Sequence, residues 1–152
     1  MKFEHIIQVN DQLDPLIEPL SREEIWEGLL ESVEVPERFL PGLDSSRILR
    51  REAGAFRREL RIGHVIVHDT VHLTPGHRFV TDSEPSAEVP ALTRTVTIEE
   101  PIEGEYVVRF RYERSPQGQE PLAPAFAAVL ESAWLQADID LIAHVRRARM
   151  AQ

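Results

Sequence analysis

The stretch FRRELRIGHVIVHDTVHL, residues 56–73, decides the fold because it reads as two strands joined by a tight turn. On both sides of Gly63-His64 every second residue is apolar over most of the stretch, and alternate side chains of a strand share one face. Gly63-His64 suits a two-residue hairpin turn. Counting outward from this turn pairs Arg58 with Asp69, each in the middle of an otherwise apolar face.

The predicted pair of Arg58 and Asp69 indicates more than a hairpin. A buried charge is unfavourable unless an opposite charge compensates it, so the pair indicates a core or a pocket with one polar feature. Two alternatives stay open at this point. The pair is purely structural, or a one-residue bulge breaks the pairing, and a shift in register turns both side chains outward.

Length and composition predict a single domain over residues 1–152 that is large enough for a real core. The net charge of −9 disfavours binding to nucleic acid, and the absence of Cys excludes disulfides and thiol chemistry. No stretch approaches the ~18 apolar residues of a membrane span, and the first residues lack the apolar core of a secretory signal. We therefore expect a cytoplasmic protein with no membrane span.

Hydrophobic periodicity and turn residues predict seven strands, at 3–9, 45–52, 56–62, 65–73, 78–82, 93–99 and 106–114. A helix opens at the capping box Ser21–Glu24, a short helical turn covers 36–40, and a long helix covers 122–150 after a polar linker at 115–121. The hairpins imply an antiparallel sheet with one apolar face, which only the last helix is long enough to cover. The space between sheet and helix is the expected ligand site.

Several motifs resemble those of one known family. They are FEHIIQVND at 3–11, SREEIWEGL at 21–29, PERFLPGLD at 36–44, RREL at 57–60, TIEE at 97–100, FRYE at 110–113 and ADID at 137–140. The chain resembles the SRPBCC superfamily, with its START/Bet v 1-like helix-grip fold, and within it the AtaL-like family of unknown function. The resemblance implies an α+β fold in which a curved, antiparallel seven-stranded sheet wraps around a long C-terminal helix, in β-α-α-β6-α order.

The favoured function is binding of a small, largely hydrophobic or aromatic molecule between the sheet and the last helix, with its polar end near Arg58 and Asp69. One alternative, which the resemblance suggests, is a polyketide-type cyclase, aromatase or dehydratase acting in the same cavity. A second alternative is a protein-interaction module that uses the acidic face of the first helix, Glu23–Glu34.

The candidate ligand-binding residues follow from these faces. Arg58 would hold a carboxylate, enolate or phenolate, with Asp69 orienting it, because the guanidinium fork fits planar oxyanions. Tyr106 and Tyr112 would present hydroxyls to the cavity, although plain core packing is the simpler role of such residues. The other candidates for the cavity wall are Phe110, Trp26, Phe126, Leu130 and Trp134. No catalytic residue is assigned.

The sequence predicts no metal and no cofactor. His64, His68 and His72 share a strand face, but at this spacing neighbours lie ~13 Å apart, too far to bind one ion. His5 is isolated and is expected at the surface or satisfied in the core. The chain has no Gly-rich phosphate loop and no Gly-x-Ser-x-Gly elbow.

Overall fold

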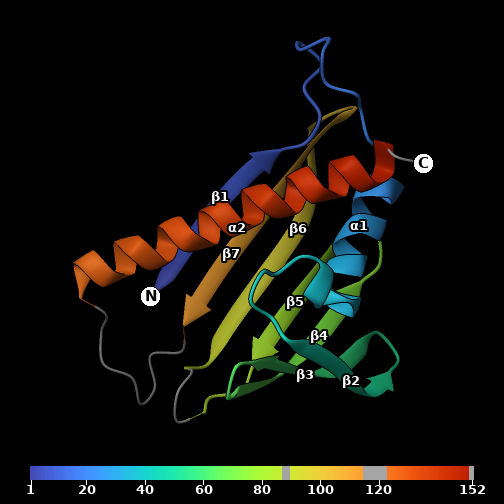
Figure 1. Ribbon diagram of the computed structural model, residues 1–152. Helices are drawn as coiled ribbons and strands as arrows, with labels where there is room; N and C mark the ends of the chain where they lie inside the picture. The colour runs from blue at the N-terminus through green and yellow to red at the C-terminus, as the bar shows by residue number, and fades with distance from the viewer. Residues whose placement is uncertain (87–89, 115–122, 151–152) are drawn as a thin grey trace.

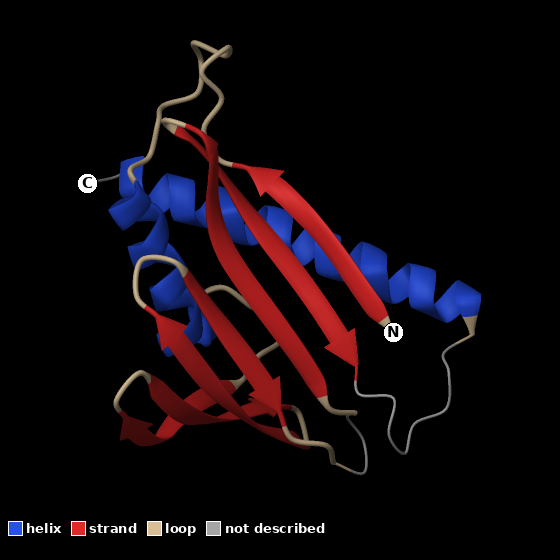
Figure 2. Ribbon diagram, turned by 180° about the vertical axis from the view of Figure 1, so that it is seen from behind, coloured by secondary structure: helices blue, strands red, loops and turns tan. Residues whose placement is uncertain are grey.

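The computed structural model describes residues 1–86, 90–114 and 123–150. The predicted linker 115–121, the first predicted residue of the last helix and part of the loop after residue 83 lie outside these ranges. The described chain forms one antiparallel sheet in the order β1-β7-β6-β5-β4-β3-β2, with both helices on the same face (Figure 1; Figure 2). This is the predicted helix-grip architecture.

The elements lie close to the predicted ranges. The strands are β1 Lys2–Gln8, β2 Ser45–Glu52, β3 Ala55–Ile62, β4 Val65–Thr74, β5 Arg78–Ser83, β6 Leu92–Ile102 and β7 Glu105–Arg114. The helices are α1 Arg22–Glu34, the 3-10 helix η1 Pro36–Arg38 and α2 Pro124–Met150. Ser21 caps α1 as predicted: its hydroxyl accepts from the Glu24 backbone, and the Glu24 carboxylate accepts from the Ser21 backbone.

The hairpin that decides the fold has the predicted register. Ile62 pairs with Val65, Leu60 with Val67, and Arg58 with Asp69, and no bulge interrupts the ladder between β3 and β4. Gly63 has a φ of 60°, a backbone conformation that glycine adopts without steric cost. The pairing of the two charges is therefore confirmed.

Strand β6 is longer than the predicted range, which ends at residue 99. It continues to Ile102, with a shift in register between Glu99 and Ile102. Pro101 lies within this irregular stretch, where a residue without a backbone N–H is tolerated because the ladder is already interrupted.

The core lies between the inner face of the sheet and the two helices. Phe79, Phe110 and Val108 from the sheet meet Ile25 and Leu29 from α1, and all are fully buried. The helices approach closely at Gly28, where an added Cβ would lie 2.5 Å from a Val145 methyl group. Any larger residue at this position would push α1 away from α2.

The first turns of α2 do not pack into this core. The buried residues of α2 are Asp138, Leu141, Ile142 and Val145, whereas Phe126 is 57% exposed. In both views the N-terminal turns of α2 extend past the edge strand β1 (Figure 1; Figure 2). No strand lies beneath these first turns, which carry Phe126, one of the predicted candidates for the cavity wall.

Candidate functional site

A cavity of about 250 Å³ lies between the sheet, α2 and the end of α1 with the segment that follows it. Its polar lining comes mainly from the sheet and includes Arg58, Thr81, Arg94 and Tyr112, and α2 adds Asp138. The rest is largely apolar and comprises Val33, Pro36, Phe39, Leu40, Leu92, Trp134, Ala137 and Leu141, together with Ser32.

The cavity is continuous with the molecular surface. Phe39, Leu40 and Ala137 also line a second, more open hollow between the segment 37–41 and α2. These three shared residues lie where the cavity adjoins the more open hollow, a place that we call the mouth. A groove with apolar walls and a few convergent polar groups is the usual form of a small-molecule site.

The first charged pair at the cavity is Arg58 with Asp69. Arg58 donates from Nε to Oδ1 at 2.9 Å and from Nη2 to Oδ2 at 2.6 Å, and its Nη1 donates to the Val33 carbonyl at 2.9 Å. The residues are 6% and 4% exposed, and only Arg58 lines the cavity. Both carboxylate oxygens of Asp69 accept from one guanidinium, so the charge of Arg58 is fully compensated.

A second polar cluster, which sequence analysis missed, contains Arg94, Tyr112, Asp138 and His5. Arg94 donates from Nε to the Tyr112 hydroxyl at 3.2 Å and from Nη2 to Asp138 Oδ1 at 3.0 Å. The Tyr112 hydroxyl donates to Asp138 Oδ2 at 2.6 Å. Asp138 is 1% exposed, so its charge depends on these partners.

His5 reaches the same carboxylate from the edge strand. Its ring packs between those of Phe3 and Phe110, at centroid distances of 5.1 and 5.3 Å. Nε2 lies 3.0 Å from Asp138 Oδ2, which is ion-pair distance but without hydrogen-bond geometry, and Nδ1 has no hydrogen-bond partner among the described residues. His5 is therefore a partly buried member of the cluster rather than an isolated histidine.

Two members of the cluster that line the cavity, Tyr112 and Arg94, have well-defined protonation states. Burial raises the pKa of Tyr112 well above its ordinary value; the positive Arg94 opposes this rise and the Asp138 carboxylate adds to it. Tyr112 is thus a neutral hydrogen-bond donor at physiological pH. Burial lowers the pKa of Arg94, but Tyr112 and Asp138 outweigh it and raise the pKa overall, so Arg94 stays charged.

Other candidates from the sequence lie at or below the cavity. Trp134 lines it together with Tyr112, and their rings stack at 4.3 Å with an interplanar angle of 4°. Phe110 is fully buried and supports the floor, with the Arg94 guanidinium 5.6 Å from its ring centroid.

The remaining candidates are not among the residues that line the cavity. Tyr106 lies six residues from Tyr112 along β7, roughly 20 Å away, and its ring contacts Arg22 instead. Trp26 packs half-buried against the core from α1. Phe126 and Leu130 lie on the first turns of α2, which extend past the sheet.

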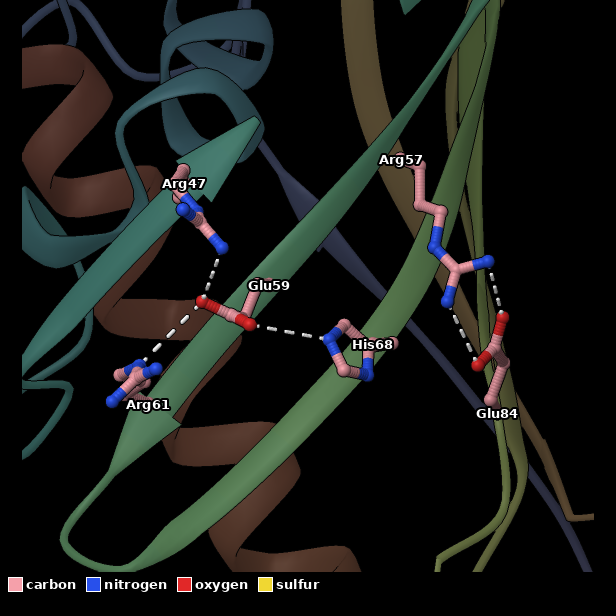
Figure 3. Close-up of polar contacts among 6 residues, drawn as sticks. All are labelled: Arg47, Arg57, Glu59, Arg61, His68 and Glu84. Atoms are coloured by element: carbon pink, nitrogen blue, oxygen red, sulfur yellow. Dashed lines mark hydrogen bonds and ion pairs between the residues drawn. The ribbon is translucent and has the colours of Figure 1, made fainter. Parts of the chain in front are cut away.

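The outer face of the sheet carries a separate set of ion pairs (Figure 3). Glu59 lies 3.4 Å from Arg47, 3.5 Å from Arg61 and 3.3 Å from His68, and Arg57 pairs with Glu84. Within the described ranges, no group of three or more metal-binding side chains comes together, and no helix is long and apolar enough to cross a membrane.

Solved structures with the same architecture define the class. The chain matches the di-domain aromatase/cyclase StfQ of the steffimycin biosynthetic pathway (TM-score 0.72, 14% identity, 99% of this chain and 52% of that one). It matches Ara h 8.0201 with a TM-score of 0.67 and 10% identity, over 95% of this chain and 97% of that one. It also matches the Zhui aromatase/cyclase from Streptomyces sp. R1128 with a TM-score of 0.62 and 14% identity, over 97% of this chain and 94% of that one. These likenesses establish a Bet v 1-like helix-grip fold.

The family follows from the sequence itself. The model of the AtaL family, described as acetylaranotin biosynthesis cluster protein L, matches residues 7–151. The chain therefore belongs to the AtaL family. No curated protein matches it significantly.

Proposed function

We propose that this protein binds a small, largely hydrophobic molecule in the cavity between the sheet and α2, with the polar end of the ligand at Arg58 and Arg94 on the sheet. The observation that carries the proposal is the cavity itself, in which mostly apolar residues surround the guanidinium groups of Arg58 and Arg94. Such a lining favours an apolar body through burial and fixes its orientation through a few hydrogen bonds.

The cavity volume limits the size of the ligand. Ligand pockets for drug-sized molecules span roughly 300–1,000 Å³, and this cavity, at about 250 Å³, lies just below that range. A molecule with one or two rings fits this space, whereas a sterol or a full-length polyketide chain would have to extend through the mouth at Phe39 and Leu40.

The comparisons support a small-molecule role. The family takes its description from a biosynthesis cluster, and two of the similar folds are aromatase/cyclases. At the identities found, these likenesses concern the fold, and fold alone does not determine function.

The enzymatic alternative, a cyclase, aromatase or dehydratase, has one observation in its favour, which is that Tyr112 and Asp138 both line the cavity. The protonation of Tyr112 and the hydrogen bonds of Asp138 favour ligand binding over proton transfer. The raised pKa of Tyr112 makes it reluctant to give up its proton. Asp138 already accepts hydrogen bonds on both oxygens, from Arg94 and from Tyr112, so both oxygens are engaged before any substrate arrives.

The alternative of an acidic docking helix loses support from the charges around α1. Glu27 pairs with Arg149 at 3.0 Å, Glu31 with Arg38 at 3.0 Å, and Glu34 with Arg51 at 3.2 Å. Much of the acidic face is thus compensated within the chain, which leaves less charge to attract a basic partner.

The experiment is calorimetric titration with 2-naphthol, a two-ring probe. We expect saturable binding with one site per chain, which Ala137→Trp abolishes because the indole fills the mouth. The matched control is Ala128→Trp, which adds the same bulk on an exposed position of α2. Absence of binding to the wild-type protein, or equal binding by both variants, would contradict the proposal.

A further inference from the structure

Two arginines line the cavity, and their partners differ. Three N–H groups of Arg58 are engaged, two by Asp69 and one by the Val33 carbonyl. Asp69 gives both oxygens to this one guanidinium, the bidentate arrangement that neutralises a guanidinium most completely. Arg58 therefore has a dedicated counter-charge and few donors left for a ligand.

Arg94 is compensated less completely. Its Nε faces a neutral hydroxyl and its Nη2 uses only one oxygen of Asp138, while its Nη1 makes no hydrogen bond within the described part of the chain. The Asp138 carboxylate is shared with Tyr112 and lies at ion-pair distance from His5. The Arg94 side chain is 23% exposed against 7% for Arg58, although both lie on the inner face of the sheet.

The position of Arg94 is also fixed before any ligand arrives. Its guanidinium carbon lies 5.6–5.8 Å from the ring centroids of Phe79, Phe110 and Tyr112. Cation–π contacts and two hydrogen bonds hold the group, so a ligand would not have to order it. Charge-assisted hydrogen bonds are stronger at a partly buried guanidinium than in water.

We propose that Arg94, rather than Arg58, receives the ligand, and that the ligand is a small aromatic or conjugated acid whose carboxylate or enolate oxygen accepts from the free Nη1 of Arg94. Its flat apolar body would lie against Trp134, Leu92 and Leu141, which line the same cavity. This inference rests on the proposed function and adds the anionic class of the ligand and the residue that selects it.

The test compares 2-naphthoate with 2-naphthol, which have the same ring system but differ in charge. We expect Arg94→Gln to weaken naphthoate binding at least about tenfold, the effect of losing one hydrogen bond to a charged group. Naphthol binding should change by roughly twofold at most, because its neutral hydroxyl gains less from a charged donor. The control is Arg111→Gln, whose side chain lies on the outer face of β7 and is 59% exposed.

Two further variants keep the test decisive if Arg94→Gln unfolds. Arg94→Lys keeps the charge but loses the fork and should bind naphthoate with intermediate affinity. Arg94→Gln/Asp138→Asn removes both charges together and should still lose the preference for naphthoate.

The outcomes separate the two proposals. Failure of both probes to bind the wild-type protein would overturn the proposed function itself. Binding of both probes with an equal effect of the Arg94 substitutions on each, or with no effect, would leave the cavity a binding site and overturn the role of Arg94.

Discussion

The Arg58–Asp69 pair and the Arg94–Asp138 cluster each join an arginine to an aspartate, but they differ in how completely the two charges are hydrogen-bonded to each other. In each, an arginine on the inner face of the sheet meets a buried aspartate. In the first, the partners are neighbours in one hairpin, and both oxygens of Asp69 accept from Arg58. In the second, the aspartate lies on α2 and is shared among three groups. Local pairing engages both oxygens of Asp69 with one guanidinium, whereas pairing across layers leaves Nη1 of Arg94 without a hydrogen bond to any described residue.

The largest effect that would test this contrast is on stability. Asp69→Ala should destabilise the fold by about 3–5 kcal/mol, because it leaves Arg58 charged, buried and without a carboxylate. Urea denaturation measures this change. The double variant Arg58→Met/Asp69→Leu should recover most of the loss, since hydrophobic residues can replace a buried pair. A loss below about 1 kcal/mol for Asp69→Ala would show that the pair is not desolvated.

The matching change in the second cluster should have a smaller effect. Asp138→Ala should cost about 2 kcal/mol, because Arg94 can turn its donors to water in the cavity and Tyr112 stays neutral. The same urea experiment applies. A cost equal to that of Asp69→Ala would mean that both arginines depend equally on their aspartates, which would contradict the difference between the two clusters.

The Arg94–Asp138 cluster contains a tyrosine, which the Arg58–Asp69 pair lacks, so titration in alkaline solution tests this cluster alone. The pKa of Tyr112 is raised by burial, and that of Tyr106 is raised by burial and by Glu100. The unfolded chain ionises its tyrosines near pH ~10. A raised folded pKa means that the contribution of neutral Tyr112 to stability is complete below pH ~10 and is lost as pH rises through the folded pKa.

Tyrosinate absorbance provides the measurement. At pH ~10, the reference value for an unperturbed tyrosine, the native protein should show little tyrosinate, whereas the protein in urea should show about half ionisation of both tyrosines. Tyr112→Phe should remove one tyrosine from the late transition. Half-ionisation of the native protein at that pH would refute the buried environment of Tyr112.

The smallest effect is expected on the outer face. Burial raises the pKa of Glu59, but His68, Arg47 and Arg61 outweigh it and lower the pKa overall. This contribution is present above the ordinary carboxyl pKa and is lost as pH falls through the lowered value. Glu59→Gln should shift the urea midpoint less than Asp138→Ala does, and the shift should shrink in high salt. A larger shift than that of Asp138→Ala would overturn the ranking.

Sequence reasoning succeeded where the deciding contacts are local. The register that pairs Arg58 with Asp69 follows from strand alternation and a two-residue turn, and both signals lie within residues 56–73. Arg94 carries the same signal, because it alternates with Leu92 and Val96 on the inner face of β6. Asp138 likewise falls at helical spacing from Trp134, Leu141 and Ile142.

What could not be predicted are the contacts between layers. Nothing local to His5, Arg94 or Asp138 shows that the three meet, because β1, β6 and α2 are brought together only by tertiary packing. The same limit explains Phe126 and Leu130. Helical periodicity identifies an apolar stripe, but it does not show how far the helix runs past the edge of the sheet.

The most direct test of the binding cavity is a two-dimensional amide NMR titration of the isotopically labelled protein with 2-naphthol. We predict saturable shifts centred on the residues that line the cavity, among them Thr81, Leu92 and Arg94 on the sheet and Trp134, Ala137 and Leu141 on α2. Shifts that do not saturate, or that are confined to the exposed first turns of α2 around Phe126 and Val129, would contradict a binding site between sheet and helix.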